Sequence, residues 1–230
     1  MQNITILELC LTPQASHRRA DSELEWQAMN ESAEDRLRTD SETLDAALVR
    51  LDSGTRDHSL RVSRYSAILA ETLGVPPAQS SIIGIAAKFH EIGKLAIPEA
   101  ILYKPAKLTA EEQAVLREYP LHGYEMVRHV PSLAEAAEIV YSHRERFDGT
   151  GYPRGLKGEA IPLAARIVAV ADTFDMFISE RPHRREQAIT AARAEIRRWS
   201  GSCFDPRVLE SFTNIPIEMW ENVRTDSQES

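Results

Sequence analysis

The chain is poor in cysteine and contains no long apolar run, and each absence narrows the class of protein. Its two cysteines, Cys10 and Cys203, lie far apart in the 230 residues and form no CxxC pair. This spacing argues against a disulfide framework and a thiolate metal site, and it is typical of a reducing compartment. No stretch of about 18 apolar residues occurs, and no basic segment precedes an apolar one at the start. We therefore expect a soluble, cytoplasmic protein that does not enter a membrane.

Basic side chains are fewer than acidic ones. The chain has 27 basic and 35 acidic side chains, which give a formal net charge of -8. Residues 21–45 alone hold nine acidic and two basic side chains, typical of a solvated helix face. This balance argues against non-specific binding of nucleic acid, whereas the locally basic region 144–185 permits a small anionic ligand in a pocket.

The alternating pattern of strands is almost absent, with residues 4–11 as a weak strand candidate. Apolar residues instead recur at helical spacing, and Gly and Pro separate the periodic segments. Thr109 and Glu112 form a capping-box pattern at the start of one helix. The pattern predicts an all-α fold with helices over about 44–51, 60–73, 80–89, 109–119, 121–129, 132–143, 163–178 and 184–199. We predict an acidic N-terminal extension (1–40), one helical domain (41–213) and a C-terminal tail (214–230).

Asp172 is the first candidate site residue, because it interrupts the apolar run 167–171. A buried, ionised carboxylate costs several kcal/mol unless it is paired, hydrogen-bonded or bound to a metal. An arginine is one partner and a metal is another. His58, His90 and Glu91 lie near helix ends or on helix faces that can converge on Asp172. Two imidazoles and two carboxylates suit a divalent iron, manganese, zinc or nickel ion, although His58 alone also fits a surface position.

His143 is a further candidate, because it ends a predicted helix shortly before the glycine-rich segment Asp148–Pro153. The sequence of this segment, DGTGYP, is typical of a loop that can lie close against a ligand. The other four histidines lack such a context and are expected to face solvent: His17, His122, His129 and His183.

Three segments together resemble the HD-GYP domains, a branch of the HD metal-dependent phosphohydrolases that hydrolyse cyclic di-GMP. They are HEIGKLAIPEAILYKPAKLT, HRERFDGTGYPRGLKGEAIP and ARIVAVADTFDMFISERPHR. The resemblance runs from about residue 44 to residue 192 and implies an HD-domain helical bundle with C-terminal HD-GYP helices. It also implies a cluster of two or three metal ions whose bridging water attacks the phosphodiester.

The resemblance assigns roles to matching positions of this chain. One metal site would be formed by His58, His90, Glu91 and Asp172, and His143 would belong to a second. Lys94 would meet a phosphate oxygen, and Lys94, Glu91 and Arg144 would act in catalysis. The positions that match contacts with the dinucleotide are Lys94, Tyr152, Asp175, Arg181 and Arg184.

Four positions depart from the family pattern. Gly54, Tyr119 and Arg144 replace ligand residues, and Glu91 replaces the aspartate that bridges the metals. A guanidinium about 4 Å from a dication would repel it by about 8 kcal/mol at an effective dielectric near 20. We therefore expect at most one divalent ion, or none, with Arg144 supplying positive charge where the second metal would lie. His122, one turn after Tyr119, is a weaker candidate for a substitute ligand.

These departures leave three functions open. The sequence favours a degenerate HD-GYP signalling domain that binds cyclic di-GMP or a protein partner, with weak or no hydrolysis. An active cyclic di-GMP phosphodiesterase with a mononuclear or rearranged centre is the alternative, and a hydrolase of another nucleotide or phosphate ester is the third. Whether the chain is an enzyme stays open. The expected partners are cyclic di-GMP, a diguanylate cyclase or other signalling protein, and a second copy of the chain, with no nucleic acid and no membrane.

Overall fold

The computed structural model describes residues 42, 44–49, 51, 53–179 and 185–223. Over these residues the chain is helical, with one isolated bridge between Ser200 and Phe204 and no strand, so the predicted all-α class is confirmed. The strand candidate at 4–11 and the extension 1–40 lie outside the described residues. The elements are α2 (Ser53–Thr72), α3 (Pro77–Phe89), η2 (Ile92–Ala96), α4 (Glu99–Leu102), α5 (Ala110–Leu116), α6 (Tyr119–Arg128), η3 (Pro131–Leu133), α7 (Ala134–Ser142), η4 (Gly158–Ala160), α8 (Leu163–Ser179), α9 (Arg185–Arg198), α10 (Pro206–Asn214) and α11 (Ile217–Glu221).

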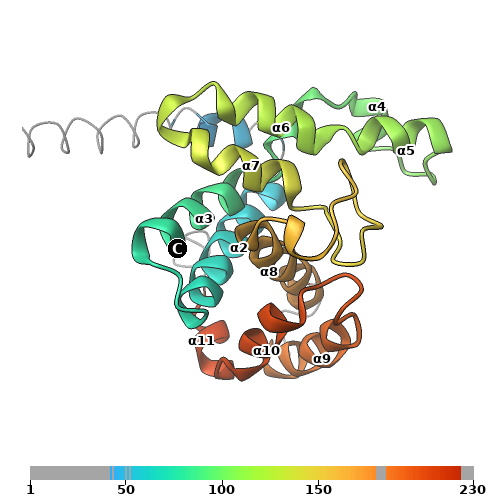
Figure 1. The fold of residues 1–230 in the computed structure, drawn as a ribbon. Helices are drawn as coiled ribbons and strands as arrows, with labels where there is room; N and C mark the ends of the chain where they lie inside the picture. Colours follow the sequence, from blue (N-terminus) through green and yellow to red (C-terminus); the bar gives the residue numbers. More distant parts are fainter. Residues whose placement is uncertain (1–41, 43, 50, 52, 180–184, 224–230) are drawn as a thin grey trace, which may run out of the picture.

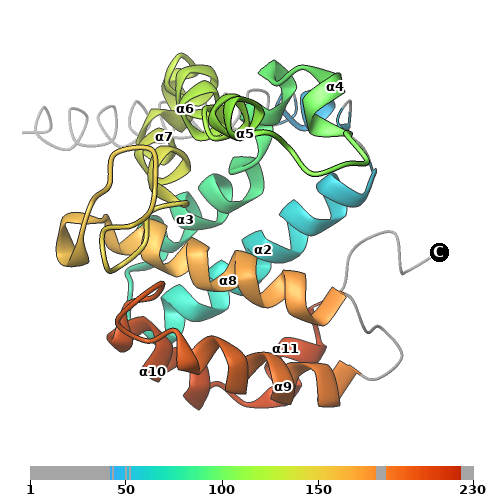
Figure 2. The same cartoon turned by 90° about the vertical axis from the view of Figure 1, so that its right-hand side faces the viewer.

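Helices α2, α3 and α8 form the middle of the bundle. Helix α2 packs against both α3 and α8, and α7 packs against α3. Figures 1 and 2 show α4, α5 and α6 at one end of this group and α9, α10 and α11 at the opposite end. The site residues on α2 and α8, and those that follow α3 and α7, therefore come together from segments that are distant in sequence.

The boundary predicted between the helices 109–119 and 121–129 lies a few residues earlier in the structure. Thr109 and Glu112 do form the predicted capping box: Glu112 N donates to Thr109 Oγ1 at 3.2 Å, and Thr109 N donates to Glu112 Oε2 at 2.8 Å. Helix α5 ends at Leu116, and α6 begins at Tyr119 with Pro120 in its first turn. Proline is well tolerated there because the first amides of a helix have no intrahelical partner. Tyr119 thus begins a helix, where the sequence pattern placed it at the end of one.

Aromatic side chains close the core between α2, α8 and the last helices. The ring centroid of Trp220 lies 5.7 Å from that of Tyr65, 5.1 Å from that of Phe174 and 5.4 Å from that of Phe212. Trp220 is 1% exposed and lies on α11. The segment predicted as a C-terminal tail therefore contains a helix that packs into the core.

Close packing of η2 on α6 requires glycine at position 93. A Cβ atom at Gly93 would lie 2.0 Å from the carbonyl oxygen of Tyr119 and 2.4 Å from the amide nitrogen of Gly123. Such distances are far inside van der Waals contact, so a larger residue would push η2 away from α6. The contact holds the turn that follows His90 against the start of α6, which carries Tyr119.

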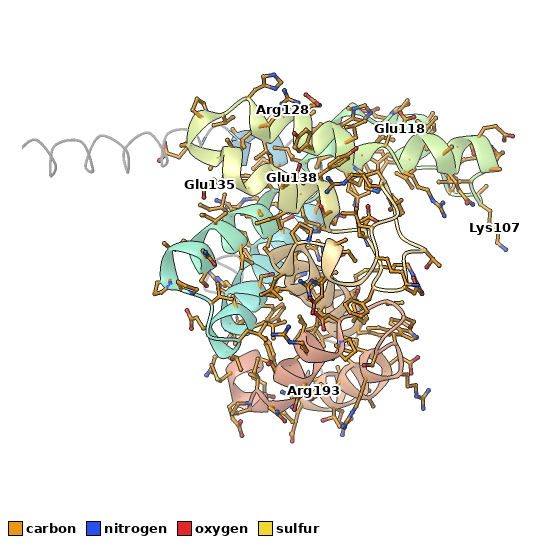
Figure 3. All side chains as sticks on the ribbon, viewed as in Figure 1. Lys107, Glu118, Arg128, Glu135, Glu138 and Arg193 are labelled. Atoms are coloured by element: carbon orange, nitrogen blue, oxygen red, sulfur yellow. The ribbon has the colours of Figure 1, made fainter. Side chains whose placement is uncertain are left out.

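The outer side of α6 is polar. Glu118, directly before α6, and Arg128, its last residue, lie at the surface of the molecule, with side chains that are 59% and 46% exposed (Figure 3). Among the described helices, none combines the length and the apolar character needed to cross a bilayer.

Candidate metal centre

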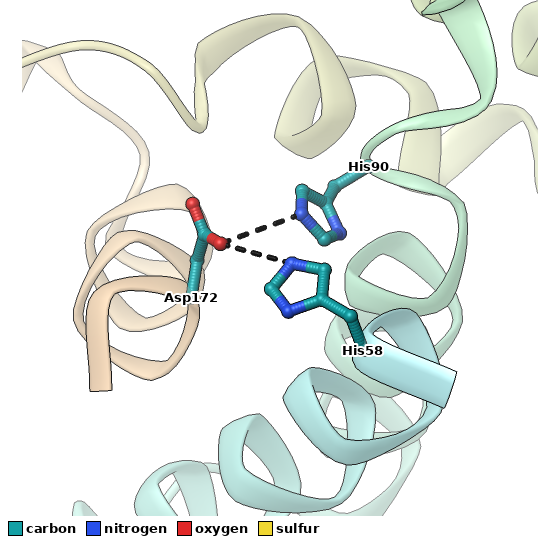
Figure 4. A group of neighbouring side chains, drawn as sticks. All are labelled: His58, His90 and Asp172. Atoms are coloured by element: carbon teal, nitrogen blue, oxygen red, sulfur yellow. Dashed lines mark ion pairs between the residues drawn. The ribbon is translucent and has the colours of Figure 1, made fainter. Parts of the chain in front are cut away.

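His58, His90 and Asp172 come from three different helices and meet at one point (Figure 4). His58 lies on α2, His90 directly follows α3, and Asp172 lies on α8. One donor atom from each residue lies within 4.8 Å of the other two. The Oδ1 atom of Asp172 is 3.1 Å from His58 Nε2 and 3.7 Å from His90 Nε2. The convergence predicted for these three residues is therefore present.

The orientation of His90 leaves a buried lone pair for a cation. Its Nδ1 donates a hydrogen bond to the carbonyl oxygen of Ala87 at 2.6 Å, so Nε2 faces Asp172. Within the described part of the chain, His90 Nε2 and Asp172 Oδ1 are buried atoms without a hydrogen-bond partner, and His58 Nε2 forms an ion-pair contact with Asp172 Oδ1. Unpaired buried polar atoms of this kind are costly. A divalent ion would satisfy both, so the three residues fit a metal.

Asp172 also has the arginine partner that the sequence left open. Arg144 Nη1 lies 3.2 Å from Asp172 Oδ2. Burial alone would raise the pKa of Asp172, but the charge of Arg144 and the two imidazoles hold this pKa well below its usual value. Burial likewise disfavours the charged form of His58, yet its carboxylate neighbours Asp172 and Asp175 raise the pKa of His58 to about 9. In the absence of a metal, positive side chains thus neutralise the buried carboxylate.

Tyr119, His143 and Arg144 form a hydrogen-bonded cluster beside this centre. His143 Nδ1 donates to the carbonyl oxygen of Val140 at 2.6 Å, so Nε2 accepts from Tyr119 Oη at 2.8 Å. Arg144 Nε donates to the same hydroxyl. Burial, with the neighbouring imidazole of His90 and the charge of Arg144, holds the pKa of His143 well below its usual value. Both ring nitrogens of His143 therefore have protein partners, and its predicted role as a metal ligand stays a prediction.

Glu91 lies beside the three donors but is engaged elsewhere. Its side chain is 6% exposed, Oε1 pairs with Lys94 Nζ, and the same oxygen is 3.9 Å from Arg144 Nη2. Burial would raise the pKa of Glu91, but the adjacent imidazole of His90 and the positive charge of Lys94 lower it. Among the described residues, the donor group within 4.8 Å consists of His58, His90 and Asp172, and Glu91 is not a member. The predicted ligand and catalytic roles of Glu91 and Lys94 stay predictions.

Glu145 holds the glycine-rich loop against the helix end that carries His143. Its carboxylate is buried and accepts hydrogen bonds from the amide of Arg154 at 2.8 Å and from that of Leu156 at 3.0 Å. A Cβ atom at Gly151 would lie 2.3 Å from the amide nitrogen of Arg146, so only glycine allows this close return of the chain. The sequence reasoning missed Glu145, although an acid directly before a glycine-rich loop is a usable signal for such an anchor.

A cleft of about 260 Å³ opens beside Asp172, between α8, the glycine-rich loop and the turn after α9. Arg144 and Arg146 contribute positive charge to its wall, and Tyr152 and Trp199 contribute aromatic faces. Guanidinium groups with aromatic rings suit a ligand that carries both phosphates and bases. Tyr152 lines this cleft, and its predicted binding role stays a prediction.

Asp175 is fully buried, and its predicted contact with a dinucleotide stays a prediction. Arg61, which the sequence reasoning missed, forms a bidentate ion pair with it. Arg61 is one turn after His58 on α2, and this spacing is the signal that could have drawn attention to it. The ligand contacts predicted for Arg181 and Arg184 lie outside the described residues.

The HD domain family matches residues 28–208, which is most of the chain. The chain therefore belongs to the HD domain family, and the resemblance to its HD-GYP branch is confirmed. The chain is 42% identical to the cyclic di-GMP phosphodiesterase response regulator RpfG of Xanthomonas campestris over 186 residues. The aligned region covers 80% of this chain and 49% of that protein. The chain is 38% identical over 180 residues to a cyclic di-GMP phosphodiesterase of Thermotoga maritima, covering 77% and 49%.

A solved structure agrees with this family. A cyclic GMP-AMP-specific phosphodiesterase of Vibrio cholerae aligns with a TM-score of 0.62 at 19% identity, over 83% of this chain and 52% of that chain. At this identity the likeness concerns the fold. The chain spans about half the length of the curated relatives that it matches.

Proposed function

We propose that this chain is an HD-GYP-type domain that binds cyclic di-GMP at a centre for at most one divalent ion, with weak or no hydrolysis. The observation that carries the proposal is the cluster of Tyr119, His143 and Arg144. In the family these positions would serve a second metal, whereas here they bond to one another. The guanidinium of Arg144 adds a positive charge that opposes a further cation.

The remaining parts of the site support binding of a phosphodiester. His58, His90 and Asp172 would hold the single ion, which supplies positive charge for a phosphate oxygen and lowers the pKa of bound water. Lys94 and Arg144 add positive charge beside that ion. The aromatic wall of the adjacent cleft would contact a base.

Hydrolysis at this one-metal centre is the second candidate function. It is favoured by the position of Arg144, whose Nη1 atom lies 3.2 Å from the carboxylate that would hold the ion. An arginine in that place can stabilise charge that develops on a transferring phosphoryl group. A protein partner, such as a diguanylate cyclase that contacts the glycine-rich loop, is compatible with either function.

Two measurements on the full chain separate these functions. Calorimetric titration with cyclic di-GMP, with and without zinc or manganese, measures binding, and chromatography of the reaction mixture detects linear dinucleotide. We expect saturable binding and little or no product. Rapid turnover that disappears in His90→Ala would favour hydrolysis as the function over binding alone. Absence of cyclic di-GMP binding under every metal condition would contradict both functions.

A further inference from the structure

We infer that Asp175 is a positioning residue for the metal centre: it orients the imidazole of His58 and is itself held in place by Arg61. This inference rests on the proposed metal centre and deepens it. His58 Nδ1 lies 2.8 Å from Asp175 Oδ2, and His58 Nε2 lies 3.1 Å from Asp172 Oδ1. The ring is thus bracketed by two carboxylates of α8.

The sequence places these two carboxylates on one face of α8. Asp172 and Asp175 are three residues apart, and side chains at this spacing are neighbours on a helix surface. Because α2 packs against this face, the imidazole of His58 lies between them. Helix α8 therefore carries both Asp172, which would bind the metal, and Asp175, which accepts a hydrogen bond from Nδ1 of His58. The other ring nitrogen of His58, Nε2, faces Asp172.

Arg61 holds the carboxylate of Asp175 in one orientation. Arg61 Nε donates to Asp175 Oδ1 at 2.7 Å, and Arg61 Nη2 donates to Asp175 Oδ2 at 2.9 Å. Ser179 Oγ donates to the same Oδ2 at 3.2 Å. A bidentate pair of this kind fixes the plane of the carboxylate as well as its charge. Complete burial of Asp175 excludes competing water.

The consequence for the metal is chemical as well as steric. A neutral imidazole has one N–H donor and one acceptor nitrogen. When Nδ1–H of His58 donates to Asp175, its lone pair is on Nε2, which faces Asp172 and His90. A carboxylate in this place also makes the imidazole a stronger donor to the ion, and losing such a partner typically weakens metal binding by about 10- to 100-fold. This role differs from the ligand contact that the family resemblance implies for Asp175.

Asp175 could instead serve only to tie α2 to α8, and a second buried carboxylate tests this. Asp205 is 2% exposed, pairs with Arg166, and caps α10 by accepting from the amide of Arg207. It does not belong to the group of donors around Asp172. Asp205→Asn therefore removes an equivalent buried charge from a position outside the metal centre.

The experiment compares the unchanged chain with Asp175→Asn and Asp205→Asn. Zinc affinity is measured by competition with a chelator, and stability of the metal-free proteins by urea denaturation. We expect both variants to lose stability, Asp175→Asn to bind zinc about 10- to 100-fold more weakly, and Asp205→Asn to stay within about twofold.

A third measurement addresses the imidazole directly. In the zinc-loaded unchanged chain, the ring ¹⁵N spectrum should show His58 with a protonated Nδ1 and a metal-bound Nε2, and Asp175→Asn should alter this signature. Equal zinc affinity in the unchanged chain and in Asp175→Asn would overturn the inference alone. Failure of the unchanged chain to bind zinc would overturn both the inference and the metal centre of the proposed function.

Discussion

Replacing Arg144 by methionine should strengthen the binding of a divalent ion. Arg144 Nη1 lies 3.2 Å from Asp172 Oδ2, whereas His58 and His90 lie against Oδ1 of the same carboxylate. An ion held between these three donors would lie about 6 Å from the guanidinium. At that distance and an effective dielectric of about 20, a dication and a guanidinium repel each other by about 5 kcal/mol.

Solvent reduces this repulsion, because the side chain of Arg144 is 29% exposed. Halving it leaves about 2.5 kcal/mol, which corresponds to about 60-fold in the dissociation constant. The same substitution removes a partner of the buried Asp172, so the metal-free variant should lose about 3–5 kcal/mol of unfolding free energy. Bound metal should restore part of that loss, since a ligand that binds only the native state stabilises it.

Zinc affinity, measured by competition with a chelator at pH 7, tests the charge argument. Arg144→Lys keeps the charge but loses the planar fork, and it should bind zinc close to the affinity of the unchanged chain. Arg198→Met removes the same charge from a side chain that is 75% exposed, and it should leave zinc affinity unaltered. The reasoning is refuted if the methionine and lysine variants at position 144 bind zinc equally well.

Three further outcomes test other parts of the structure. Tyr119→His combined with Arg144→His should raise the number of zinc ions bound per chain in elemental analysis, and an unchanged count would mean that Gly54 or Glu91 prevents metal binding. Trp220→Ala should lower the unfolding free energy by about 3–5 kcal/mol in urea, because the ring is buried in the aromatic core; a loss below about 1 kcal/mol would contradict the packing of α11. Trp199→Ala should weaken cyclic di-GMP binding by about 1–3 kcal/mol in calorimetry, and an unchanged affinity would place the base elsewhere.

Local sequence patterns predicted the elements more reliably than their boundaries. The capping box at Thr109 is a purely local interaction and formed as expected. The break between α5 and α6 was predicted at Pro120, but α5 ends at Leu116 and α6 begins at Tyr119, because proline is tolerated in the first turn of a helix. Trp220 shows a second difference: nothing near it in the sequence reveals that its ring fills a space between distant helices.

The candidate site was predicted in its chemistry and only partly in its geometry. His58, His90 and Asp172 are metal-ligating residue types, and their convergence was predicted from their positions near helix ends or on helix faces and from the family resemblance. The orientation of Glu91 toward Lys94, and of His143 toward Tyr119, depends on side-chain torsions and neighbours that no spacing rule contains. Residue types and motifs therefore predicted a metal site without predicting which side chains face one another.

The sequence by itself determined the all-α class, the HD family, and the presence of an arginine where a metal ligand is expected. These properties depend on periodicity and on motifs, which are local along the chain. The tertiary structure decided that Arg144 pairs with Asp172 and bonds to Tyr119, and that Asp175 lies buried between Arg61 and His58. Residues more than 100 positions apart make the contacts of Asp175. Only helix packing brings them to hydrogen-bonding distance, and burial at that place makes each pairing strong enough to set the role of the residue.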